Sequence, residues 1–127
     1  MKLDKINFGK QKLNICQVSL KGNVPIIIDN YQKLKLFYED FNIFVICPKK
    51  DLRYFKKKLK YDEFTVISED QIISFPKFEK IFFQLSKRYR FKSLFKKRLP
   101  WYYQQILKLA FVFYFLQKYQ KKIILWD

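Results

Sequence analysis

Acidic residues directly follow two apolar runs of this chain, and that placement suggests chemistry. Asp127 comes after the continuous apolar run at 123–126, and Glu69 with Asp70 comes after the β-branched run at 64–68. Carboxylate oxygens at the ends of strands are the ligands that Mg²⁺ or Mn²⁺ prefers beside substrate phosphates. We therefore predict Asp127 as a divalent-cation ligand. Helix capping or solvation is the ordinary alternative for Glu69 and Asp70.

Polar side chains with a second kind of chemistry lie near the start of an apolar stretch that follows Pro100. Gln104, Gln105 and Lys108 are one turn or less apart, so a helix over 101–120 brings them together on one face. Amide and ammonium groups of this kind can bind phosphate or support an adjacent carboxylate. Ser19 adds a hydroxyl at the end of an apolar run at 13–20, and surface solvation is the alternative for the two glutamines.

The elements that must position these residues alternate regularly. Strands are predicted over 13–20, 41–47, 64–68 and 122–126, and the last has the pattern of a strand covered on both faces. Helices are predicted from Pro25, from an Asp51 cap to 60, over a looser amphipathic part at 71–85, and over 101–120. This alternation predicts one α/β domain over 1–127: a three-layer αβα fold with a mostly parallel, Rossmann-like sheet.

Parallel strands end at one edge of their sheet, and a connecting helix begins at that same edge. We therefore expect Ser19, Glu69, Asp70 and Asp127 to share an edge with the start of the 101–120 helix. Ligands of open α/β folds bind at this edge.

Composition excludes several classes of site. Only two glycines are present, so neither a dinucleotide-binding glycine motif nor a phosphate-binding P-loop exists. The chain has no histidine, which leaves a serine or cysteine hydrolase triad and a Cys/His metal cluster without support. Cys16 and Cys47 lie in apolar strands and are predicted to be reduced and buried.

The net charge is +16, from 27 Lys and Arg against 11 Asp and Glu, and it favours anionic partners. AT-rich codon usage is an alternative source of this Lys, Phe, Tyr and Ile excess. The stretch 87–98 interleaves basic and aromatic residues, which suits either phosphate binding or a solvated helix face. No signal peptide or membrane-spanning segment is predicted, so we expect a cytoplasmic protein with a peripheral contact to an anionic membrane.

Four motifs together carry a resemblance to a known family. They are VICPKKD at 45–51, VISEDQI at 66–72, LPWYYQQILKLAF at 99–111 and IILWD at 123–127. The chain resembles an uncharacterised bacterial glycosyltransferase family that is marked by a W-x-x-Q-Q-x-x-K-L helix and a following D-x-D. The likeness covers most of the chain from about Ile15, and it is to the nucleotide-sugar-binding half of a GT-A type fold.

The resemblance implies a reaction and a set of site residues. Sugar would pass from a nucleotide-sugar donor to a cell-surface saccharide acceptor, with Mn²⁺ or Mg²⁺ at the D-x-D. Asp127 holds the position of the first Asp and would contact metal or ribose, which leads us to expect a fragment that is inactive alone. Ser19, Glu69 and Asp70 would line the nucleotide pocket, and Gln104, Gln105 and Lys108 would support the motif or meet phosphate.

A different class of function competes with the transferase. A non-enzymatic basic module could bind RNA or an anionic membrane through the stretch 87–98 and the lysine-rich helix at 51–60. The basic residues are spread over the whole chain instead of forming one recognisable binding motif, so nucleic acid is the less favoured partner.

Overall fold

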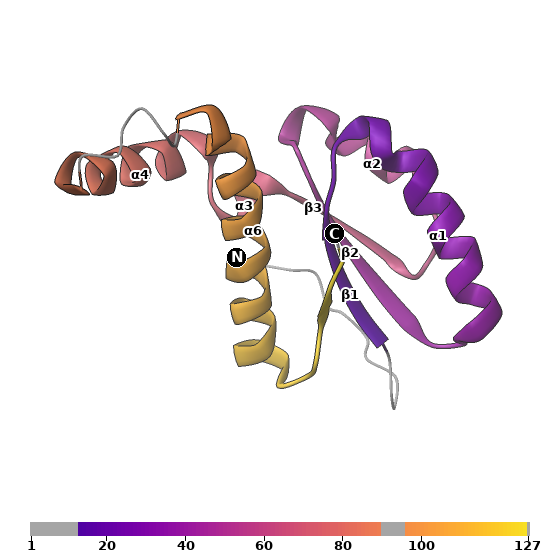
Figure 1. Ribbon diagram of the computed structural model, residues 1–127. Coiled ribbons are helices and arrows are strands. Elements are labelled where there is room, and N and C mark those ends of the chain that lie inside the picture. The colour runs from indigo at the N-terminus through magenta and orange to yellow at the C-terminus, as the bar shows by residue number, and fades with distance from the viewer. Residues whose placement is uncertain (1–12, 90–95, 127) are drawn as a thin grey trace.

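The computed structural model describes residues 13–89 and 96–126 and has a four-stranded parallel sheet (Figure 1). Its strands are β1 (Leu13–Val18), β2 (Phe41–Cys47), β3 (Phe64–Ser68) and β4 (Ile124–Leu125). They lie side by side in the order β3-β2-β1-β4. The predicted three-layer, Rossmann-like α/β fold is therefore confirmed, with strand bounds that match the predicted ones for β2 and β3.

The helices are α1 (Val24–Phe37), α2 (Leu52–Lys58), α3 (Glu69–Ile72), α4 (Phe75–Tyr89) and α6 (Leu99–Tyr119). Short 3-10 turns at Lys21–Asn23, Lys49–Asp51 and Lys96–Arg98 precede α1, α2 and α6. Pro25 lies in the first turn of α1, as predicted, because a helix start needs no N–H there. Asp51 occupies the N-cap position of α2, as predicted, but its side chain makes no capping hydrogen bond.

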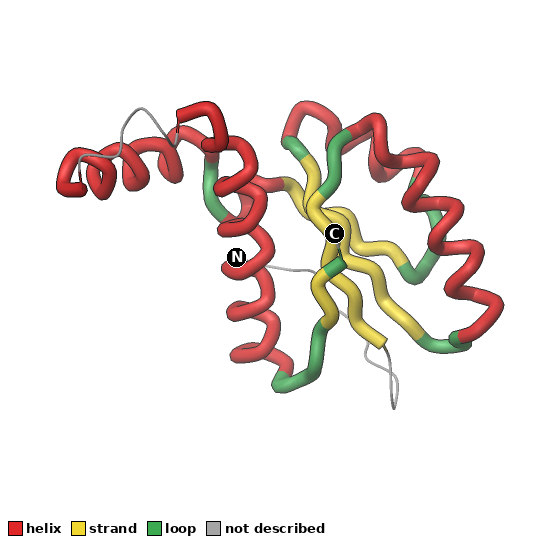
Figure 2. Tube along the Cα trace, viewed as in Figure 1, coloured by secondary structure: helices red, strands yellow, loops and turns green. Residues whose placement is uncertain are grey.

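Helices cover both faces of the sheet (Figure 2). Alternate side chains of β2 point to opposite faces, and all seven of its residues are buried. On one face Ile43 and Val45 pack with Ile27 of α1 and Phe55 of α2. On the other face the ring centroid of Phe44 lies 5.3 Å from those of two α6 rings, Phe111 and Phe115.

Helix α6 packs on the sheet through one residue in every four. Leu99, Tyr103, Leu107, Phe111 and Phe115 are all buried and lie along one face of the helix. The helix ends where Gln120 takes a left-handed conformation, with φ of 51°, and its N–H donates to the carbonyl of Leu116. This turn returns the chain to the sheet as β4.

Strand β4 corrects one expectation. The apolar run at 123–126 is typical of a strand covered on both faces, yet Ile124 is 51% and Leu125 43% exposed. The reason is topological: β4 pairs with β1 alone and forms the sheet edge, so only one of its sides has a neighbour among the described strands. The flanking residues remain partly buried, Ile123 against the α6 side and Trp126 against the α1 side.

Both cysteines are free and buried, as predicted. Cys16 faces α6 and Cys47 faces α1 and α2. Burial raises the pKa of each thiol to about 12, so both stay protonated at neutral pH. Among the described residues, no helix combines the length and apolar character needed to cross a bilayer.

Candidate functional site

The connecting helices change faces between β1 and β4. Helices α1 and α2 follow β1 and β2 on one face of the sheet, whereas α6 precedes β4 on the other face. The chain therefore leaves β1 and enters β4 from opposite sides of the sheet (Figure 1). In open α/β sheets the crevice outside the carboxyl ends of two such strands is where ligands bind. Ser19 directly follows β1 at this position.

The hydroxyl of Ser19 is buried and unsatisfied. Ser19 is 2% exposed, and its Oγ has no hydrogen-bond partner among the residues that the structure describes. Its backbone N–H donates to the carbonyl of Ile46 at 2.9 Å, which holds the residue against β2. Leaving a hydroxyl buried without a partner costs roughly 1–3 kcal/mol. Such a group at a ligand-binding edge is a candidate for contact with a bound molecule.

The loop after Ser19 is open to solvent and leads into a helix N-terminus. Residues 20–23 are exposed, and a Cβ added at Gly22 would meet no heavy atom within 4 Å. The first turn of α1 holds no acidic residue, and Asn23 makes no side-chain capping bond. The positive end of a 14-residue helix dipole thus faces this loop without a protein carboxylate in the first turn to neutralise it.

Lys21 places a cation in the same loop. Its Nζ lies 4.6 Å from the ring centroid of Tyr54, on α2. A cation–π contact at an exposed site contributes about 0.5–1 kcal/mol, enough to bias the position of the ammonium without removing it from solvent. The lysine therefore adds positive charge close to the start of α1.

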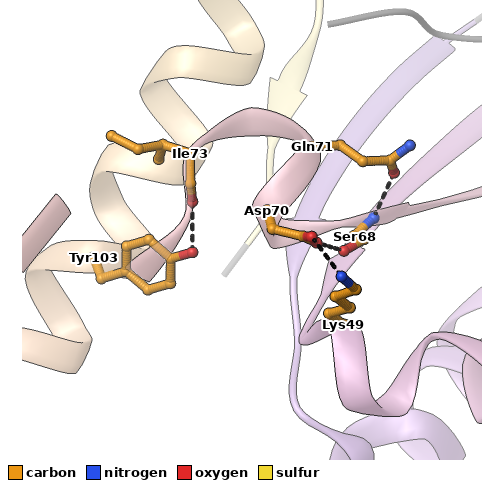
Figure 3. A network of polar contacts seen from close by, with 6 residues as sticks. All are labelled: Lys49, Ser68, Asp70, Gln71, Ile73 and Tyr103. Atoms are coloured by element: carbon orange, nitrogen blue, oxygen red, sulfur yellow. Dashed lines mark hydrogen bonds and ion pairs between the residues drawn. The ribbon is translucent and has the colours of Figure 1, made fainter. Parts of the chain in front are cut away.

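Asp70 is engaged by its neighbours at the end of β3 (Figure 3). Its carboxylate accepts a hydrogen bond from the Ser68 hydroxyl and lies 3.5 Å from Nζ of Lys49. The Ser68 hydroxyl, with the Lys49 charge as a smaller cause, lowers the pKa of Asp70. The backbone N–H of Ser68 donates to Oε1 of Gln71 at 2.9 Å, so this turn is closed by its own side chains. Asp70 acts locally as a partner of Ser68 and Lys49.

Glu69 is in a different environment. It is half-buried, and this burial is the largest cause that raises its pKa. The neighbouring carboxylates of Asp70 and Asp51 raise the pKa further. Adjacent strands lie about 4.8 Å apart, so the end of β3 is roughly 10 Å from the end of β1 and roughly 14 Å from that of β4. Glu69 and Asp70 share the carboxyl edge with Ser19 but are separated from it by β2.

Lys108 is a buried cation between α6 and the sheet. Its side chain is on the α6 face that carries Leu107 and Phe111, and its charge opposes the burial-driven rise in the pKa of Cys16. Cys16 is the register partner of Leu125, so Lys108 lies beside the boundary between β1 and β4. Gln104 and Gln105 are half-buried and belong to the turn that precedes it. The structure thus places Lys108 beside the β1–β4 boundary.

The predicted metal ligand, Asp127, lies outside the described residues, as do residues 90–95 of the basic stretch at 87–98. Within the described ranges, no group of three or more Cys, Asp or Glu side chains is placed to hold a metal ion. The described residues therefore do not fit a divalent cation by themselves.

Two residues at this edge make contacts that are not predicted from the sequence. Lys49 lies two residues after the end of β2 and pairs with Asp70. Tyr103 was assigned no role, yet its hydroxyl donates to the carbonyl of Ile73 at 2.7 Å and ties α6 to the segment after α3 (Figure 3). Position after a strand was the available signal for Lys49, whereas only the tertiary contact identifies Tyr103.

Neither a scan against protein-family models, nor a search of curated proteins, nor a search of solved structures found a match to this chain.

Proposed function

We propose that this chain is the nucleotide-sugar-binding part of a glycosyltransferase, and that the donor binds outside the carboxyl ends of β1 and β4. One observation carries the proposal: where the helices change faces, Ser19 holds a buried hydroxyl that has no hydrogen-bond partner among residues 13–89 and 96–126. A donor oxygen at that position would accept its hydrogen bond. The motif resemblance specifies a sugar nucleotide within the broader class of phosphate-containing ligands.

The charges around this edge suit a diphosphate. Lys21 and the start of α1 lie on one side of the Ser19 position, and Lys108 lies on the α6 side of the β1–β4 boundary. A helix N-terminus and nearby ammonium groups together favour bound phosphate. The open space at Gly22 leaves room for phosphate to approach the loop.

The roles of the remaining site residues follow from their positions. Glu69 and Asp70, two strands away from Ser19, would meet a part of the donor distant from the phosphates, such as the ribose or base. Gln104 and Gln105 lie one turn from Lys108 and would position the part of the site around it. The saccharide acceptor and a catalytic base have no assigned residue.

Transfer would break the bond between the sugar and the departing diphosphate, on which negative charge then develops. Cationic groups fixed in advance beside that oxygen lower the barrier, because they need no reorganisation when the charge forms. Lys21 and Lys108 are the described residues that would do this. A divalent cation at Asp127 remains a prediction.

The proposal is tested by measuring the binding of UDP, GDP and their glucose conjugates to the full chain. Calorimetry and tryptophan fluorescence measure this binding. Ser19→Ala should weaken binding of the preferred nucleotide about ten-fold, the effect of losing one hydrogen bond to a charged ligand. Gly22→Val should weaken it further by filling the space beside the loop, without disturbing the fold.

Ser74→Ala is the matched control, because Ser74 lies outside this edge and its hydroxyl only accepts an exposed backbone bond from Lys77. It should bind nucleotides like the unmodified chain. Unchanged binding in both Ser19→Ala and Gly22→Val would contradict the proposed site. Salt-sensitive binding of RNA that exceeds binding of any nucleotide would instead support the basic-module alternative.

A further inference from the structure

Helix α4 leaves the body of the domain. Its first half is anchored to α6: the ring centroid of Phe78 lies 5.2 Å from that of Tyr103, and Phe82 stacks on Tyr102 at 5.9 Å. Beyond these contacts the helix runs away from the sheet (Figure 1). Where the helix projects in this way its apolar side cannot pack on the sheet, so another surface would have to cover it.

The apolar side of α4 continues past its anchor. Ile81 and Leu85 lie three and seven residues after Phe78, on the same side of the helix, and Leu85 is 53% exposed. The polar side carries the exposed Lys80, Lys77 borders the apolar side one turn before Ile81, and Glu79 adds one half-buried carboxylate to the helix. A helix with a strong apolar side, a basic polar side and low overall hydrophobicity is typical of helices that lie in a membrane–water interface.

The outward side of α6 extends this surface. Starting from Tyr102, where Phe82 stacks, apolar residues recur at spacings of four and three and face away from the sheet. Phe113 is 67% exposed. We call this set, together with the two α4 residues, the outer apolar surface; its members are Ile81, Leu85, Ile106, Leu109, Phe113 and Leu116. An apolar surface of this extent on one side of a domain marks an interaction site.

Charge indicates the partner. Residues 80–126 contain 12 Lys and Arg and no Asp or Glu, whereas all ten acidic residues before Asp127 lie in 1–79. Exposed cations stand at both ends of α6, with Lys97 and Arg98 before its first turn and Lys118 in its last. Apart from Glu79 near the start of α4, the two helices that carry the outer apolar surface have only positive side-chain charges.

We propose that the outer apolar surface docks on an anionic lipid bilayer, with α4 lying in the interface. Apolar side chains would enter the headgroup boundary, and the surrounding lysines would attract anionic lipids, each contributing about 1 kcal/mol near the surface. A second copy of the chain is a poorer occupant, because it would bring another acid-free, positively charged segment against the first. The proposal is independent of the donor site at the end of β1.

The test is sedimentation of the full chain with vesicles. Vesicles of equal parts phosphatidylglycerol and phosphatidylcholine should bind it at least about ten-fold more tightly than pure phosphatidylcholine. Raising salt from about 0.1 M to about 1 M should remove most of this difference, because the screening length falls from about 10 Å to about 3 Å. Ile81→Gln combined with Leu85→Gln should weaken binding about ten-fold without changing the charge.

The matched control is Leu36→Gln combined with Phe37→Gln, at the end of α1 on the other face of the sheet. These side chains are even more exposed, and their replacement should leave vesicle binding unchanged. Leu109→Gln combined with Phe113→Gln tests the same surface on α6 if the α4 variant fails to fold. Equal vesicle binding by folded surface variants and control would overturn the proposal. So would a dimer in sedimentation velocity that the surface variants convert to monomer, since a second copy would then be the occupant.

Discussion

Nδ2 of Asn42 donates a 3.1 Å hydrogen bond to Oδ1 of Asn14, its register partner on the neighbouring strand. Nδ2 of Asn14 in turn donates to the carbonyl of Lys122, just before β4. These two amides connect β2, β1 and the approach to β4 within a largely apolar interior. The chain thus brings its last strand into register through polar groups near the amino end of the sheet.

Asn14→Ala should lower the free energy of unfolding by about 1–3 kcal/mol, because it leaves the buried Asn42 amide without its partner. The measurement is the urea midpoint at constant slope. Gln84→Ala, at an exposed position of α4, is the control and should change stability by less than about 0.5 kcal/mol. Equal midpoints for the two variants would refute a structural role of the pair.

Ser19→Ala should keep or raise stability, because it removes a buried hydroxyl that has no partner in the described structure. A gain of about 1 kcal/mol would raise the Tm by roughly 4 °C. Thermal unfolding without ligand measures this. A marked loss of stability would mean that the hydroxyl has a structural partner, and would remove the observation on which the donor site rests.

Glu69 and Asp70 should respond to pH in opposite directions. The folded-state pKa of Asp70 is lowered from 3.8, so its stabilisation is present above that value and is lost as pH falls. The folded-state pKa of Glu69 is raised from 4.5, so its ionisation destabilises the fold as pH rises through and above that value. At pH 7, Asp70→Asn should therefore lower the urea midpoint and Glu69→Gln should raise it. Both differences should shrink near pH 3, and the same sign for both variants would contradict these shifts.

Lys108→Met should weaken binding of nucleoside diphosphates about ten-fold and leave binding of the free nucleosides unchanged. The reason is that a buried ammonium beside the β1–β4 boundary would act on the phosphates alone. Calorimetry with UDP and uridine, or with GDP and guanosine, separates the two effects. Lys118→Met, at the far end of α6, is the control and should bind both ligands normally. Parallel losses for nucleotide and nucleoside would indicate a role of Lys108 in the fold.

Asp127→Asn should abolish any increase in nucleotide affinity that Mn²⁺ produces, because it removes the carboxylate predicted to bind the cation. Titration of UDP or GDP with and without Mn²⁺, in both the unmodified chain and the variant, measures this. Asp62→Asn, near the opposite edge of the sheet, is a charge-matched control. An unchanged Mn²⁺ effect in Asp127→Asn would refute the metal assignment.

Local patterns determined most of the secondary structure. The β-branched runs at 41–47 and 64–68 form strands with the predicted bounds, and Pro25 and Pro100 each lie in the first turn of a helix. The alternation of these elements is enough to predict a parallel sheet covered on both faces, because parallel neighbours need crossover helices. The sequence also placed Ser19, Glu69, Asp70 and the start of α6 at one edge.

Only the tertiary structure decided which of these residues are neighbours and which are buried. The order β3-β2-β1-β4 separates Ser19 from Glu69 by a whole strand and makes the apolar β4 an exposed edge. Neither property is encoded in a local run, because burial depends on which strand lies next to it. The burial of the Ser19 hydroxyl away from any partner in the described part of the chain, and the burial of Lys108 beside Cys16, likewise depend on how distant segments pack. The departure of α4 from the body is also a property of the tertiary structure.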